Sequence, residues 1–78
     1  MRVSVEQLKK LIVDICGIDP AIIQDHATFK EDMRMDSLNI ADLIASLEED
    51  HDIIVDQAEA MNIRTFGQLV EYIRALDD

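Results

Sequence analysis

The sequence predicts an all-α fold, a small bundle of three main helices and one short helix with a long loop between the first two. The first observation behind this prediction is that apolar residues recur at helical spacing in three separate segments. The second is that capping residues precede these segments. The third is that the single β-like run, Ile53-Ile54-Val55, has no second run to pair with, so we expect a buried loop there.

The first helix is expected to begin at Ser4, because Gln7 stands three residues later and completes a capping box. Gly17 suits the left-handed residue that commonly follows a helix. The inward face of this helix is predicted from its apolar residues, Val5, Leu8, Leu11, Ile12 and Ile15.

Residues 18–35 form the long loop, in which Pro20 is compatible with a short helical turn. A structureless loop of this length would be unusual, so packing or function is expected to hold it in place. The apolar side chains that could attach it to the core are Ile18, Ile22, Ile23 and Phe29.

The second helix should begin near Asp36-Ser37. Its apolar stripe is predicted to consist of Leu38, Ala41, Leu43, Ile44 and Leu47, broadened by Ile40.

The remaining chain should form the short helix and the last main helix. Asp56 and Glu59 can cap a short helix that runs through Met61. Thr65 and Gln68 form a capping box before the last helix. The inward face of that helix is predicted to be Phe66, Leu69, Val70, Ile73 and Leu76.

The chain has 78 residues and a formal net charge of −10, which indicates a single domain, residues 1–78, with one small core. Such a charge disfavours binding to nucleic acid and to anionic membranes, and it favours partners with basic surfaces. No apolar run is long enough to span a bilayer, and the N-terminus has no signal-peptide hydrophobic region. We therefore expect a cytoplasmic monomer without membrane insertion.

Cys16 and the two histidines offer little chemistry. Cys16 is the only cysteine, so an internal disulfide is impossible, and a buried small hydrophobe is expected. Neither His26 nor His51 lies beside a nucleophile at a recognisable spacing, and no glycine-rich phosphate loop or metal motif is present. We therefore expect no enzyme activity and no metal site.

Ser37 stands at the expected start of the second helix, where a serine is ordinarily a cap. Its surroundings are unusual, because no Lys or Arg occurs between Met35 and Ile63. The acidic residues of the same stretch are Asp36, Asp42, Glu48, Glu49, Asp50, Asp52, Asp56 and Glu59. A surface with charge of a single sign favours the steering of a basic partner.

At this point the chain resembles the acyl carrier protein family. The resemblance covers nearly all of the sequence and is carried by Phe29-Lys30-Glu31-Asp32, Asp36-Ser37-Leu38, Leu43, Leu47-Glu48-Glu49-Asp50, Asp52, Ile63 and Thr65. It implies that Ser37, flanked by Asp36 and Leu38, is the attachment point for 4′-phosphopantetheine from coenzyme A. The physical setting agrees, because a helix N-terminus favours the anionic phosphodiester.

The resemblance also implies partners and a cargo site. The partners would be a phosphopantetheinyl transferase and acyl-loading and acyl-processing enzymes with basic docking surfaces. The residues expected to face them are Arg34, Asn39, Asp42, Glu48 and Glu49. The residues expected to shelter an acyl chain are Phe29, Ile40, Ile44, Leu47, Val55, Ala60, Ile63 and Tyr72.

Several positions depart from the family pattern. Arg34 and Met35 fill a stretch that usually holds a glycine, and Asn39 replaces a common acidic residue. His51 stands where a large aromatic residue is usual, and we expect it to be partly buried and satisfied. Ala58 and Met61 make the short helix more apolar than is common. These departures favour a specialised carrier over the general carrier of fatty acid synthesis.

Two other functions stay open. A peptidyl or aminoacyl carrier is the nearest alternative, although those usually have a glycine just before the serine and a less acidic surface. The other is an unmodified helical adaptor that binds a basic partner, in which the position of Ser37 would be a coincidence.

Overall fold

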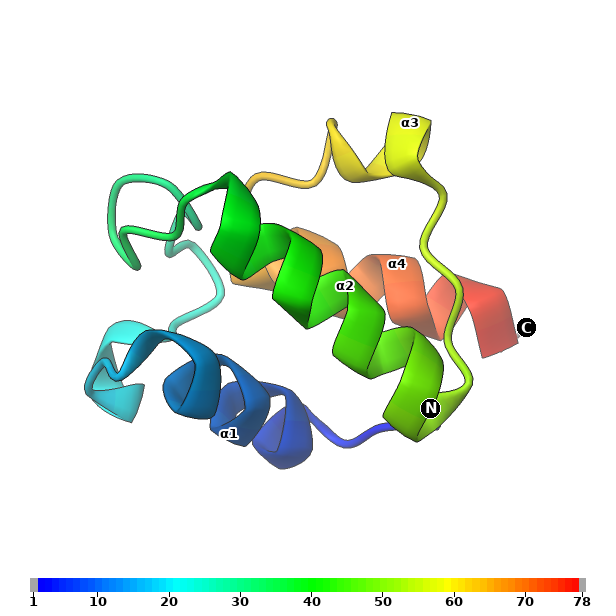
Figure 1. Ribbon diagram of the computed structural model, residues 1–78, viewed down its shortest axis with the longest axis horizontal. Coiled ribbons are helices and arrows are strands. Elements are labelled where there is room, and N and C mark those ends of the chain that lie inside the picture. Colours follow the sequence, from blue (N-terminus) through cyan, green and yellow to red (C-terminus); the bar gives the residue numbers. More distant parts are fainter. Residues whose placement is uncertain (1, 78) are drawn as a thin grey trace.

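The computed structural model describes residues 2–77, with only the backbone of Asp77, and it confirms the predicted all-α fold (Figure 1). The elements are α1 (Val5–Cys16), a single 3₁₀ turn η1 (Pro20–Ile22), α2 (Ser37–His51), α3 (Gln57–Ala60) and α4 (Phe66–Asp77). No helix in residues 2–77 has the length and apolar character needed to cross a bilayer.

The predicted caps are present at α1 and α4. The N–H of Gln7 donates to Ser4 Oγ at 3.0 Å, and the N–H of Ser4 donates to Gln7 Oε1 at 2.8 Å. Gly17 ends α1 with φ of 69°, the left-handed region that glycine adopts without strain. Thr65 and Gln68 exchange the same pair of bonds at 3.2 Å each. Local sequence therefore fixes where both helices begin and where α1 ends.

The buried stripe of α2 is narrower than predicted. Leu43 and Leu47 are buried, whereas Ala41 is exposed and the Leu38 side chain is 69% exposed. At about 100° per residue, Leu38 lies about 180° around the helix from Leu47 and so faces solvent. The prediction was also wrong for Leu76 of α4, which is 50% exposed because the last turn extends beyond the core.

The loop between α1 and α2 is held by the start of α4. The N–H of Phe29 donates to the Arg64 carbonyl, and the N–H of Phe66 donates to the Ala27 carbonyl, both at 3.0 Å. Gly67 allows this close approach, because a Cβ there would lie 2.9 Å from the Asp25 carbonyl oxygen. The long loop is therefore packed against the start of α4, as predicted from its length.

Two apolar positions in the connecting segments were predicted incorrectly. Ile23 and Phe29 are buried and anchor the long loop, but Ile22 lies on the outer side of η1 and is exposed. In the expected buried loop, Ile53 and Val55 are buried while Ile54 between them is 68% exposed. The cause is the extended backbone, in which successive side chains point to opposite sides.

Candidate functional site

The first turn of α2 is fixed by a capping box that the sequence analysis did not identify. Asp36 is the N-cap, and its Oδ1 accepts the N–H of Asn39 at 2.8 Å. Asn39 Oδ1 accepts the N–H of Asp36 in return, at 3.2 Å. The signal was available in the sequence, since an acceptor side chain three residues after an N-cap is the capping-box pattern.

Ser37 is consequently not the cap but the first residue of the helix. Its side chain is exposed, and no hydrogen bond within residues 2–77 uses its hydroxyl. The backbone N–H groups of Ser37 and Leu38 also lack partners within this range, as expected for the first turn of a helix. A free hydroxyl therefore stands among unpaired N–H groups at the positive end of the α2 dipole, a setting that favours an anion attached to Ser37.

The segment before Ser37 is tightly folded. Met33 and Met35 are buried, and their N–H groups donate to the carbonyls of Thr28 and Phe29 at 3.1 and 2.8 Å. Between them Arg34 is exposed with φ of 56°, in the left-handed region. This conformation explains why a glycine is usual in this stretch of the family, because glycine adopts it without steric conflict.

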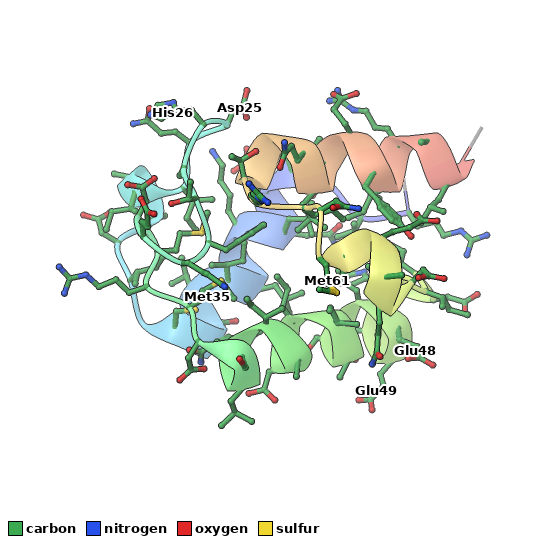
Figure 2. The ribbon with its side chains drawn as sticks, turned by 90° about the horizontal axis from the view of Figure 1, so that it is seen from above. Asp25, His26, Met35, Glu48, Glu49 and Met61 are labelled. Carbon is green, nitrogen blue, oxygen red and sulfur yellow. The ribbon has the colours of Figure 1, made fainter. Side chains whose placement is uncertain are left out.

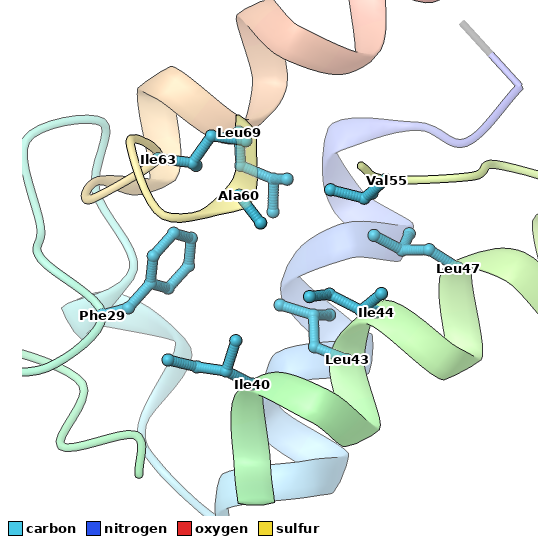
Figure 3. Close-up of a pocket in the computed structure, with 9 residues that line it drawn as sticks. All are labelled: Phe29, Ile40, Leu43, Ile44, Leu47, Val55, Ala60, Ile63 and Leu69. Carbon is cyan, nitrogen blue, oxygen red and sulfur yellow. The ribbon is translucent and has the colours of Figure 1, made fainter. Parts of the chain in front are cut away.

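An apolar pocket lies behind the first turns of α2 (Figure 3). Its volume is about 60 Å³. Its walls come from four parts of the chain: the long loop, α2, the segments on either side of α3 together with α3 itself, and α4. The lining residues are Phe29, Ile40, Leu43, Ile44, Leu47, Val55, Ala60, Ile63 and Leu69. Ile40 follows Ser37 by about one helical turn, so on α2 the pocket begins about one turn after Ser37.

Of the eight residues expected to shelter an acyl chain, all except Tyr72 line this pocket. Tyr72 does not line the pocket; its hydroxyl oxygen accepts the N–H of Asp56 at 3.3 Å and so supports the start of α3. Desolvation raises the pKa of Tyr72, and the Glu59 carboxylate adds to this effect, so the hydroxyl stays neutral at physiological pH. Leu43 and Leu69 are the lining residues that the prediction missed.

The chain matches the family model described as "Phosphopantetheine attachment site" over residues 6–73. The match includes α2, every residue that lines the pocket, and α4 as far as Ile73. The chain belongs to this family. Members carry a covalently attached 4′-phosphopantetheine group, so the protein is a carrier, and its domain is of a carrier rather than a catalytic kind.

The residues expected to face the partners of the carrier have two different structural roles. Asp42, Glu48 and Glu49 are exposed on α2, and Figure 2 shows Glu48 and Glu49 projecting from its C-terminal part. Asn39 is half-buried and completes the capping box, so its first role is structural. The apolar character expected of the short helix is present at Met61, just after α3, whose side chain is 80% exposed.

The other reactive side chains do not add to the site. Cys16 is half-buried, and burial, together with the Asp36 carboxylate, raises the pKa of its thiol. The thiol is therefore protonated and weakly nucleophilic at neutral pH. His51 is half-buried in the last turn of α2, as expected, but within residues 2–77 its side chain has no hydrogen-bond partner. His26 lies in the long loop, away from α2 (Figure 2). Within residues 2–77 no cluster of side chains could hold a metal ion.

Proposed function

We propose that this protein is an acyl carrier that holds acyl intermediates as thioesters on a 4′-phosphopantetheine arm attached to Ser37. The exposed Ser37 hydroxyl at the start of α2 supports the attachment point. The observation that favours acyl over peptidyl cargo is the pocket, whose lining side chains are all hydrocarbon. Such a lining matches an acyl chain, whereas the amide groups of a peptide would lose hydrogen bonds there.

Each residue of the site has a defined part in this function. The Ser37 oxygen attacks the pyrophosphate of coenzyme A held by a transferase, whose base takes the hydroxyl proton. The phosphodiester to Ser37 forms as the P–O–P bond breaks, and adenosine 3′,5′-bisphosphate leaves. Asp36 and Asn39 hold the first turn in place, which keeps the hydroxyl and the free N–H groups presented to solvent. When bound, the arm supplies the thiol that forms the thioester.

The docking surface proposed for the transferase and for acyl-loading and acyl-processing enzymes surrounds Ser37 along α2. Asp42, Glu48 and Glu49 would speed encounter with basic partners. Leu38 would supply apolar contact area beside Ser37, and Met61 would supply it near α3. Arg34 interrupts the acidic surface next to Ser37, which supports a specialised partner in fatty acid, polyketide or related biosynthesis.

The attachment is tested by intact mass spectrometry after incubation with coenzyme A and a broad-specificity phosphopantetheinyl transferase. The wild type should gain one phosphopantetheine, and Ser37→Ala should gain none. Ser46→Ala is the matched control, because it removes a half-buried serine of the same helix and should load normally. Failure of the wild type with several transferases would favour the unmodified adaptor.

The cargo class is tested on the loaded carrier with NMR spectroscopy. A butyryl or hexanoyl thioester should shift the methyl resonances of Ile44, Val55 and Leu69, since these line the pocket. A glycyl thioester should leave them unchanged. Equal shifts with both cargoes, or none with either, would contradict the assignment as an acyl carrier without affecting Ser37 as the attachment point.

A further inference from the structure

A second apolar surface lies at the end of α2 that is remote from Ser37. A groove of about 230 Å³ is lined by Arg2, Asp52, Ile53, Ile54, Ile73 and Leu76. Ile53 and Ile73 form its buried floor, while Ile54 and Leu76 are the exposed apolar side chains at its sides. Large apolar side chains gathered at one groove indicate a contact surface more than isolated ones do.

The surroundings of this groove are acidic. Asp52 lines it with a side chain that is 93% exposed, and Glu49, Asp50 and Asp56 are exposed in the adjoining segments. The C-terminal ends of α2 and α4 also lie on this side of the molecule, and each contributes a partial negative charge (Figure 1). Arg2 is the cation at the groove. Its Nη1 donates to the Asp52 carbonyl oxygen at 2.8 Å and lies 3.5 Å from Asp52 Oδ2.

We propose that this groove is a second docking surface, which binds a short apolar segment flanked by Lys or Arg from a partner protein. The apolar floor would take the apolar side chains, and the acidic surroundings would pair with the basic ones. A second copy of this chain is a poor occupant, because it would bring two net charges of −10 together. An anionic membrane would be repelled for the same reason.

The position of the groove gives this surface a role distinct from cargo transfer. α2 has 15 residues, so its two ends are about 22 Å apart at about 1.5 Å per residue. A partner bound at the C-terminal end would leave Ser37, Leu38 and Asp42 free. The groove would therefore hold the carrier beside its enzymes while the arm is used at the other end.

The test uses the complete chain labelled with ¹⁵N and a 12-residue amphipathic peptide of leucine and lysine as the probe. Addition of the peptide should shift the amide resonances of residues 52–54 and 73–76. Ile54→Ser and Leu76→Ser should each raise its Kd about tenfold, as expected for the loss of most of one buried aliphatic side chain. Both residues are exposed, so the melting temperature should change little.

Leu38→Ser is the matched control, because Leu38 has about the same exposure at the opposite end of α2 (69% against 68% for Ile54). It should raise the Kd less than twofold. A peptide with serine in place of leucine should bind weakly, and salt should weaken the binding of the leucine peptide.

Five results would each overturn the proposal. Resonance shifts centred on Leu38 and Met61, or an equal loss in Leu38→Ser and Ile54→Ser, would place the contact elsewhere. Equal binding of the serine peptide would show that charge alone is recognised. A dimer in light scattering that dissociates in Ile54→Ser would assign the groove to a second copy. Binding to phosphatidylserine vesicles that depends on Ile54 would assign it to a membrane.

Discussion

The two ends of α2 differ in how each supports a left-handed residue. Arg34, just before the helix, and Asp52, just after it, both have φ of 56°. Asp52 occupies the C-cap, where this conformation is common, and Arg2 binds its carbonyl oxygen. Arg34 is exposed, and no ion pair or side-chain hydrogen bond holds it within residues 2–77. The backbone at Arg34 is held only by its neighbours, because the N–H groups of Met33 and Met35 donate to carbonyls of the long loop. The Arg34 side chain takes no part in this, so Arg34 is the better candidate for a functional constraint.

The largest effect is expected from removing the cap at the Ser37 end. Asp36→Ala should destabilise the protein by about 1 kcal/mol, since it removes the acceptor for the N–H of Asn39. Loading of Ser37 should also slow, because the first turn that presents it would fray. Urea unfolding and initial loading rates measure both effects.

Asp42→Ala is the control, as it removes an exposed carboxylate from the same helix without removing a cap. It should change the unfolding free energy by less than about 0.5 kcal/mol. Equal destabilisation by the two variants would show that charge, and not the capping box, stabilises the first turn.

A second prediction concerns partner choice at the Ser37 end. Asn39→Asp combined with Arg34→Gly should raise acyl transfer and elongation by general fatty acid synthase enzymes about fivefold, because an acid is gained and a cation is lost beside the docking surface. The fold should persist, since aspartate can also accept the N–H of Asp36. The specialised role fails if the wild type already equals a general carrier in this assay.

A smaller effect on stability separates the two left-handed residues. Arg34→Gly should stabilise the protein by about 0.5 kcal/mol, because the relief of strain exceeds the extra entropy of the unfolded chain. Asp52→Gly should give no gain, since it removes the Asp52 carboxylate that lies 3.5 Å from Arg2. Arg34→Ala keeps the strain and serves as the control. A gain in Arg34→Ala as large as in Arg34→Gly would refute backbone strain as the cause.

The smallest effect concerns pH and the loop that precedes Arg34. Asp32 Oδ2 accepts the N–H of Thr28 at 2.8 Å and its hydroxyl at 3.1 Å, and these bonds lower the pKa of Asp32. A pKa that is lower in the folded state than in the unfolded state stabilises the protein above about pH 4, and this contribution is lost as pH falls below that value.

The difference in melting temperature between wild type and Asp32→Asn should therefore shrink as the pH is lowered from about 6 to about 3. Glu31→Gln is the control, because its side chain makes no hydrogen bond within residues 2–77. A difference that stays constant over this range would contradict the assigned hydrogen bonds as the source of the stability.

The sequence by itself determined the helices and the position of Ser37. The capping boxes at Ser4 and Thr65 and the helix start near Asp36 depend on residues three positions apart, so they can be identified without knowledge of distant contacts. Most of the pocket could be anticipated as well, although only with the help of the family resemblance. The capping role of Asn39 could also have been predicted from the sequence, because Asn39 stands three residues after Asp36. Asn39 was interpreted instead only as the replacement of an acidic residue that is common in the family.

Only the tertiary structure decided which apolar side chains stay in solvent and what closes the pocket. Leu38, Ile54 and Leu76 fit an apolar pattern, but their exposure depends on where the other helices end. Leu69 reaches the pocket from α4, and Tyr72 of the same helix binds Asp56 instead. These outcomes depend on contacts between residues that are far apart in the chain. Such contacts form only when the helices pack together, so the spacing of residues within a single helix does not reveal them.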